Sequence, residues 1–128
     1  MKTILIIEDV AEARKALCRT LETNGYAVLT APNGKVGLCR VQDEAVDLVL
    51  TDILMPEMEG LETIKAIVKS YPGLPIIAMT GSLSEPFLQA ALAFGAVSGL
   101  TKPFPPASLL SQIHDALANK IDKTNGTR

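Results

Sequence analysis

The sequence has only two cysteines and one histidine, and neither residue type suggests a disulfide framework or a zinc site. Cys18 and Cys39 lie in helix-like apolar patterns, where a small buried thiol is the favoured interpretation. No set of cysteine and histidine residues has the spacing of zinc ligands. His114 is interpreted as a surface or packing residue of the last helix, because a phosphotransfer histidine needs a helical bundle.

The chain also lacks a strong charge of either sign and a long apolar run. Its 12 basic and 14 acidic residues leave a net charge of -2, which provides no general attraction to nucleic acid or anionic membranes. Acidic residues interrupt the first apolar run at once, so it is too short for a signal peptide. No stretch approaches the ~20 apolar residues that span a bilayer. We therefore expect a cytoplasmic protein without direct contacts to nucleic acid or membrane.

The apolar residues that are present predict one α/β domain. With 128 residues and 48% hydrophobic content, the chain can bury one sizeable core. Five short apolar runs alternate with five helical patterns, which is typical of a doubly wound parallel sheet with helices on both faces. The expected strands are 3–7, 26–31, 46–51, 74–79 and 97–101, and the expected helices are 10–24, 33–43, 61–70, 85–94 and 106–119. We assign 1–120 to the domain and 121–128 to a polar tail, which resembles a linker as much as a terminus.

The chain is organised around Asp52, at the end of the third strand. The apolar run before Asp52 is continuous rather than alternating, which predicts a strand buried on both faces. Pro56 and Gly60 then mark a loop. A carboxylate at the carboxyl end of such a strand is expected to be exposed, where solvent, a metal ion and a phosphoryl donor can reach it.

Polar residues follow four of the five strands, at the edge where ligands bind in open parallel sheets. These residues are Glu8, Asp9, Asp52, Thr80 and Lys102. Three clustered carboxylates repel one another unless a cation shares their site. Oxygen ligands alone favour Mg²⁺ over zinc.

This constellation predicts phosphoryl transfer to Asp52. The carboxylate would attack phosphorus, and the metal would offset the charge on the equatorial oxygens. Lys102 and Thr80 would contact the remaining phosphoryl oxygens. Lys102 would provide a positive charge on a flexible side chain, and Thr80 would provide a short hydroxyl donor.

Nearly the whole chain resembles a response-regulator receiver domain of the stand-alone chemotaxis type. The matching residues are Glu8 and Asp9, Asp52 with Met55, Pro56 and Gly60, Thr80 and Gly81, and Lys102 with Pro103 and Phe104. The resemblance implies a flavodoxin-like three-layer sandwich with strand order 2-1-3-4-5. It also implies that a histidine kinase or phosphotransfer protein phosphorylates Asp52 in a two-component phosphorelay.

The resemblance further implies the details of the site. Mg²⁺ would be bound by Asp9, Asp52 and the backbone carbonyl of Leu54, with Glu8 acting through water. The Lys102–Pro103 peptide bond would be cis. Water would slowly remove the phosphoryl group, at a rate that the family tunes at Leu54 and Ser82.

Two positions depart from the family pattern. The family usually has tyrosine or phenylalanine three residues before the lysine, where this chain has Gly99, so the usual relay from threonine to an aromatic ring is absent or replaced. Phe94 stands where the family often has a small residue. The bulk of Phe94 could fill the space that Gly99 leaves.

The fourth helix is apolar on both sides, with Gln89 almost its only polar residue. The resemblance directs Phe94 inward, which would leave Leu88 and Leu92 on the face formed by the fourth helix, fifth strand and fifth helix. We expect this face to bind a downstream protein or a second copy of the chain. Ordinary core packing of both leucines is the alternative.

Two other functions stay open. The chain could be an enzyme that hydrolyses phosphate esters through Asp52, although Leu54 occupies the place of the usual second aspartate. It could also be a docking or dimerisation module that does not depend on phosphorylation. The intact site residues favour the phosphoacceptor, which catalyses only its own phosphorylation and slow dephosphorylation.

Overall fold

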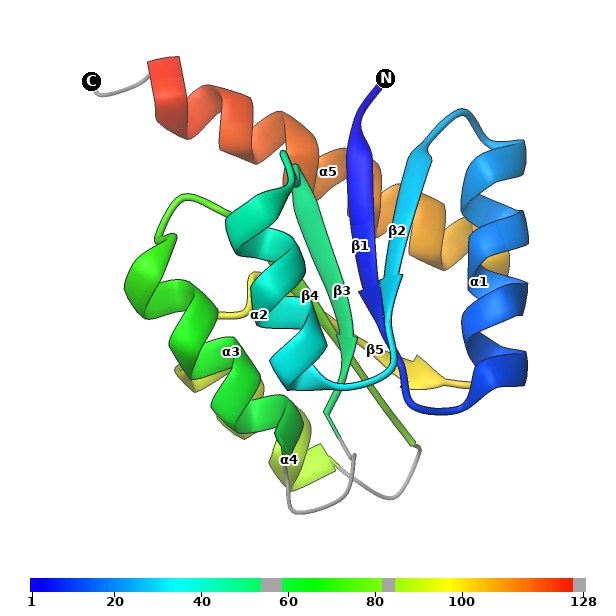
Figure 1. The fold of residues 1–128 in the computed structure, drawn as a ribbon, viewed down its shortest axis with the longest axis horizontal. Helices are drawn as coiled ribbons and strands as arrows, with labels where there is room; N and C mark the ends of the chain where they lie inside the picture. Colours follow the sequence, from blue (N-terminus) through cyan, green and yellow to red (C-terminus); the bar gives the residue numbers. More distant parts are fainter. Residues whose placement is uncertain (54–58, 82–84, 126–128) are drawn as a thin grey trace.

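The computed structural model describes residues 1–53, 59–81 and 85–125, with side chains up to Asn119 except that of Glu85. It contains a five-stranded parallel sheet (Figure 1). The strands are β1 (Thr3–Ile7), β2 (Ala27–Ala31), β3 (Leu48–Asp52), β4 (Ile76–Gly81) and β5 (Ser98–Lys102). Their order in the sheet is β2-β1-β3-β4-β5, which confirms the expected topology.

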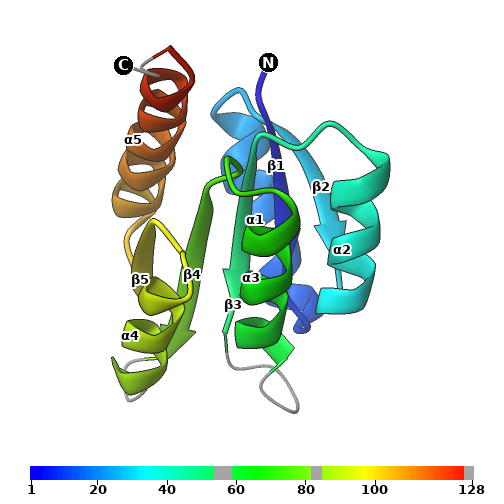
Figure 2. The same cartoon turned by 90° about the vertical axis from the view of Figure 1, so that its left-hand side faces the viewer.

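Five helices cover the two faces of the sheet and form the outer layers of a three-layer sandwich (Figures 1 and 2). They are α1 (Ala11–Thr23), α2 (Gly34–Asp43), α3 (Glu59–Ser70), α4 (Glu85–Ala93) and α5 (Pro106–Asn125). Apolar residues of α1 and α5 share one core with the sheet, and those of α2, α3 and α4 share the other. None of the described helices is long and apolar enough to cross a bilayer.

The alternation of side chains along the inner strands supplies both cores. In β1, Ile4 and Ile6 belong to the core under α1 and α5, whereas Leu5 and Ile7 belong to the core under α2, α3 and α4. All four side chains are fully buried. The central strands therefore need apolar residues at successive positions, which explains why their sequence is continuous rather than alternating.

Several predicted boundaries are confirmed and others shift. Asn33 caps α2, because its side-chain oxygen accepts a hydrogen bond of 2.8 Å from the Val36 amide. The third and fourth strands begin two residues later than predicted and continue through Asp52 and Gly81. The expected end of the last helix at 119 is wrong, since α5 runs to Asn125.

The predicted orientation of α4 is also wrong. Leu88 is only 9% exposed and lies in the core, whereas Phe94, expected inside, is 38% exposed. Leu92 is on the surface as expected, also at 38%. A Cβ atom built onto Gly99 would meet Leu88 Cδ1 and lie 2.9 Å from Leu88 Cγ, so Leu88 fills the space that we assigned to Phe94. Because glycine has no side chain, position 99 leaves room for the branched side chain of Leu88.

The two cysteines differ from each other and in part from the expectation. Both are free thiols. Cys18 is half-buried, and Cys39 is exposed rather than buried. Burial raises the pKa of the Cys18 thiol, and the nearby Glu22 carboxylate adds to this effect.

Candidate functional site

The register of the strands places three charged residues together at the carboxyl edge of the sheet. Ile7 pairs with Thr51, so Glu8 and Asp52, the next residues of their chains, lie at the same level on adjacent strands. Lys102 ends β5, two strands away from β3, at a position paired with Gly81. Because β4 lies between β3 and β5, only a long side chain at 102 can reach the carboxylates.

Lys102 spans that distance and binds both acids. Its Nζ atom is 2.9 Å from Glu8 Oε1 and 2.9 Å from Asp52 Oδ2. Burial is the strongest single influence on the pKa of Lys102 and lowers it. The hydrogen bonds and charges of Glu8 and Asp52 together outweigh burial, so the pKa is raised above its ordinary value. Lys102 therefore remains an ammonium ion at neutral pH.

Asp52 is less accessible than the sequence suggested. It is 8% exposed, and Glu8 is fully buried, so the expectation of an exposed acceptor is wrong. The ammonium group of Lys102 is held against Asp52 Oδ2. On the other side of the loop, Gly60 packs so tightly that a Cβ atom there would lie 2.5 Å from the Asp52 carbonyl oxygen. Asp52 is thus fixed by its strand and by the start of α3.

Glu8, Asp9 and Asp52 form an acidic cluster that fits a divalent cation. One carboxylate oxygen from each residue lies within 4.8 Å of the others, and Asp9 is exposed. Together with the Lys102 ammonium, the three carboxylates carry a formal charge of -2, which one divalent cation would neutralise. Hard oxygen ligands of this kind suit Mg²⁺. Leu54, the expected carbonyl ligand, and Ser82 lie outside the described residues.

Thr80 supplies a buried hydroxyl close to Asp52 along the sheet. It follows Met79, which pairs with Asp52, and it is 1% exposed. Its Oγ1 atom has no hydrogen-bond partner within the described part of the chain. A buried hydroxyl without a partner costs about 1–3 kcal/mol, so an acceptor that reached it would relieve that cost.

Arg14 contributes to the site although no sequence pattern indicated it. Its Nη1 atom donates a hydrogen bond of 2.7 Å to the backbone carbonyl of Glu8. The Val10 amide donates to Glu8 Oε2 at 3.1 Å, so the turn after β1 is held from both sides. A basic residue on the first helix is usually solvated, and only the tertiary structure reveals this contact.

A doubly wound sheet that gathers carboxylates, a lysine and a threonine at one edge is the arrangement expected of a phosphoacceptor signalling domain. The chain belongs to the response regulator receiver domain family, whose model matches residues 4–114. The peptide bond between Lys102 and Pro103 is cis, as the family resemblance implied. Receiver domains act as signalling phosphoacceptors rather than as conventional enzymes.

Some relatives that match the chain have about the same length, and others are much longer. It is 36% identical to the response regulator receiver protein CpdR of Brucella abortus over 117 residues, which cover 91% of this chain and 98% of CpdR. It is 38% identical over 122 residues, 95% of its length, to the transcriptional regulatory protein GlrR of Escherichia coli. The chain spans only 28% of GlrR and 53% of the Bacillus subtilis regulator YkoG, so it is much shorter than several curated relatives.

Solved structures show the same fold. A CheY-like receiver domain from Methanospirillum hungatei superposes with a TM-score of 0.90 at 32% identity, covering 96% of this chain and 98% of that one. The chemotaxis protein CheY4 of Vibrio cholerae gives a TM-score of 0.84 at 33% identity, covering 91% and 98%. The likeness therefore extends over essentially complete receiver domains.

Proposed function

We propose that Asp52 accepts a phosphoryl group from a histidine kinase or phosphotransfer protein and that this changes which partner the domain binds. The contact of 2.9 Å between Lys102 Nζ and Asp52 Oδ2 is the observation that carries this proposal. A half-buried ammonium that is paired with a buried carboxylate can pair instead with a phosphoryl oxygen when the negative charge moves to that oxygen. Thr80, whose hydroxyl has no partner within the described residues, supplies a donor for another oxygen.

The transfer forms one bond and breaks another. A carboxylate oxygen of Asp52 attacks phosphorus, while the bond between phosphorus and the donor's imidazole nitrogen breaks and the nitrogen keeps the electron pair. Asp9 and Asp52, with Glu8 through water and the Leu54 carbonyl, would hold Mg²⁺. When bound, the ion supplies positive charge that offsets the charge of the phosphoryl oxygens. Slow attack of water on the same phosphorus would restore Asp52.

Phosphorylation can be tested directly with a small acyl phosphate donor. Incubation with the donor and Mg²⁺ should add the mass of one phosphoryl group to the intact protein, and Asp52→Asn should abolish the adduct. Asp43→Asn is the matched control, because Asp43 is an exposed aspartate on α2. Absence of an adduct would instead favour a docking module that does not depend on phosphorylation. Sustained release of inorganic phosphate, beyond slow loss from Asp52, would favour an ester-hydrolysing enzyme.

We infer that the face formed by α4, β5 and α5 binds the downstream protein or a second copy of the chain. Leu92 and Val97 support this inference, since they are 38% and 45% exposed. Leu88 does not contribute to that face because it is buried against Gly99. Sedimentation with and without the acyl phosphate donor tests the homodimer, and Leu92→Ser should weaken any dimer without preventing phosphorylation of Asp52.

A further inference from the structure

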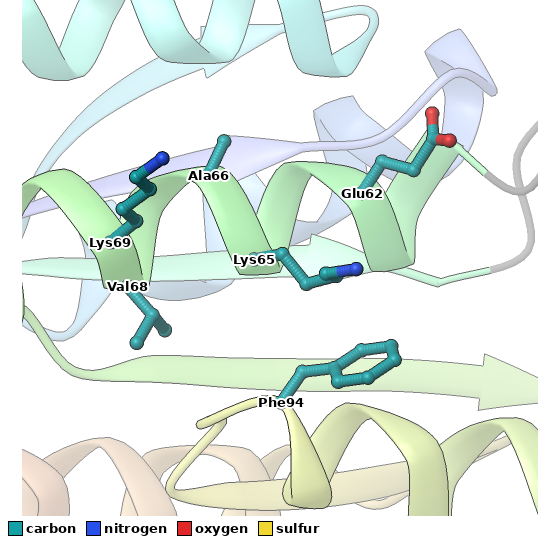
Figure 3. Close-up of a pocket in the computed structure, with 6 residues that line it drawn as sticks. All are labelled: Glu62, Lys65, Ala66, Val68, Lys69 and Phe94. Carbon is teal, nitrogen blue, oxygen red and sulfur yellow. The ribbon is translucent and has the colours of Figure 1, made fainter.

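A groove between α3 and α4 lies apart from the acidic site. It has a volume of about 620 Å³ and is lined by Glu62, Lys65, Ala66, Val68, Lys69 and Phe94 (Figure 3). None of these residues belongs to the constellation around Asp52. The helices that form the groove nevertheless follow the two strands that carry Asp52 and Thr80.

The groove has an apolar part that includes an exposed aromatic ring. Phe94 extends from the end of α4 toward α3, and the Lys65 ammonium lies 5.0 Å from the centre of its ring (Figure 3). Ala66, whose side chain is short, lies between Glu62 and Lys69 on α3 and also lines the groove. Val68 is a further apolar residue that lines the groove.

The groove also has positive charge that the described protein does not neutralise. Lys65 and Lys69 are both exposed. Among the described side chains, the salt bridges involve Arg40, Lys102 and His114, so neither groove lysine pairs with a carboxylate. Glu62 lies one turn before Lys65 and Ala66, at the opposite end of the groove from Lys69. The negative charge of the groove therefore lies at the Glu62 end of α3, and the positive charge lies toward Lys69.

We propose that this groove docks an acidic peptide segment of a partner protein. An apolar side chain of the segment would pack on Phe94, Val68 and Ala66, and its carboxylates would pair with Lys65 and Lys69. Glu62 fixes the direction of the segment, because it repels a carboxylate at the start of α3 and favours acidic residues near Lys69. This surface is separate from the face formed by α4, β5 and α5.

The same features favour a peptide over other polyanions. Two lysines beside a glutamate form too small a basic patch to follow a nucleic-acid backbone, and the chain carries a net charge of -2. Among the described residues that line the groove, Phe94 is the one with an aromatic ring, whereas single-strand binding uses several stacked rings. An apolar anchor residue flanked by acidic residues suits a groove lined by Phe94 and Val68 together with two lysines.

Selection from a random nine-residue peptide library tests the proposal, because it requires no particular partner protein. Peptides selected on the immobilised wild-type protein should be enriched in Asp and Glu beside Leu, Phe or Met. A selected peptide, synthesised with blocked ends, should bind the Lys65→Gln, Lys69→Gln double variant roughly fivefold or more weakly. Glu62→Gln should bind it more tightly, and Ala66→Gln should weaken binding by placing a longer side chain in the groove.

Matched controls separate the groove from general charge effects. Lys35→Gln changes an exposed lysine on α2 and should leave affinity unchanged. Amide shifts in NMR spectra should map to α3 and the end of α4, and thermal melts should show that every variant is folded. The proposal fails if selected peptides have no acidic excess, or if they bind the double variant as well as the wild type. It also fails if the shifts map elsewhere, or if single-stranded oligothymidylate or anionic vesicles bind the groove more tightly than the peptides.

Discussion

Gly99→Ala should destabilise the fold because the space above Gly99 is already filled. The new Cβ atom would meet Leu88 Cδ1, and it would also lie 2.9 Å from Leu88 Cγ and 3.2 Å from Leu88 Cδ2. Leu88 is 9% exposed, so its side chain has little room to move away. The backbone at Gly99 is not left-handed, so alanine brings no backbone strain.

The magnitude follows from two opposing effects. Overpacking a core costs about 1–3 kcal/mol, whereas replacing a strand glycine by alanine gains about 0.5–1 kcal/mol. We expect a net loss of roughly 1–2 kcal/mol in the free energy of unfolding, measured by urea denaturation. Gly81→Ala is the matched control, since it changes another strand glycine with no described atom within 4 Å of the new Cβ, and it should not lower the free energy of unfolding.

A double-mutant cycle identifies Leu88 as the cause. Leu88→Ala alone should cost about 2–4 kcal/mol through the cavity it creates. In the double variant the alanine at 99 occupies part of that cavity, so the loss should be smaller than the sum of the single losses by at least about 1 kcal/mol. Strictly additive losses, or a Gly99→Ala variant as stable as the wild type, would refute the proposed contact as the reason for glycine at 99.

The cap of α2, the acidic cluster and the two cysteines can each be tested separately. Asn33→Ala should lower the free energy of unfolding by about 1 kcal/mol, because it removes the hydrogen bond to the Val36 amide at the start of α2; urea denaturation measures it. Mg²⁺ at 100 times its dissociation constant should stabilise the fold by about 2.7 kcal/mol, and Asp9→Asn should largely remove this effect in thermal melts. Iodoacetamide should alkylate exposed Cys39 before Cys18. Burial and Glu22 raise the pKa of the Cys18 thiol, so its alkylation rate, followed by mass spectrometry, should rise only above the ordinary thiol pKa of about 8.5.

The strands and the acidic site could be predicted because each depends on a short stretch of sequence. A strand buried on both faces needs continuous apolar residues, and polar residues at the ends of parallel strands must meet at one edge. The meeting of Glu8, Asp52 and Lys102 follows from this topology alone. The burial of Asp52 does not, because it depends on tertiary contacts such as the one between its carboxylate and Lys102 Nζ.

The orientation of α4 could not be predicted because its sequence has no single apolar face. Phe87, Leu88, Leu92 and Phe94 offer two alternative buried stripes, and the choice depends on a glycine in another element. The end of α5 was misjudged for a different reason. Its polar last residues contain no glycine or proline before Gly126, so local sequence allows the helix to continue past Asn119. Contacts between distant residues therefore limited the prediction more than local patterns did.

The Lys102 side chain connects the ends of several strands through ionic contacts, so the charges of the site help to hold the sheet together. Its ammonium joins the ends of three strands, β1 through Glu8, β3 through Asp52 and its own strand β5. A group that displaced it from Asp52 would reduce this crosslink from three strands to two. Backbone hydrogen bonds would still join β4 to β3 just beyond Asp52, such as the 2.9 Å bond from the Ile53 amide to the Met79 carbonyl. Amide hydrogen exchange at the ends of β4 and β5 would thus report whether Lys102 is bound to Asp52 on β3.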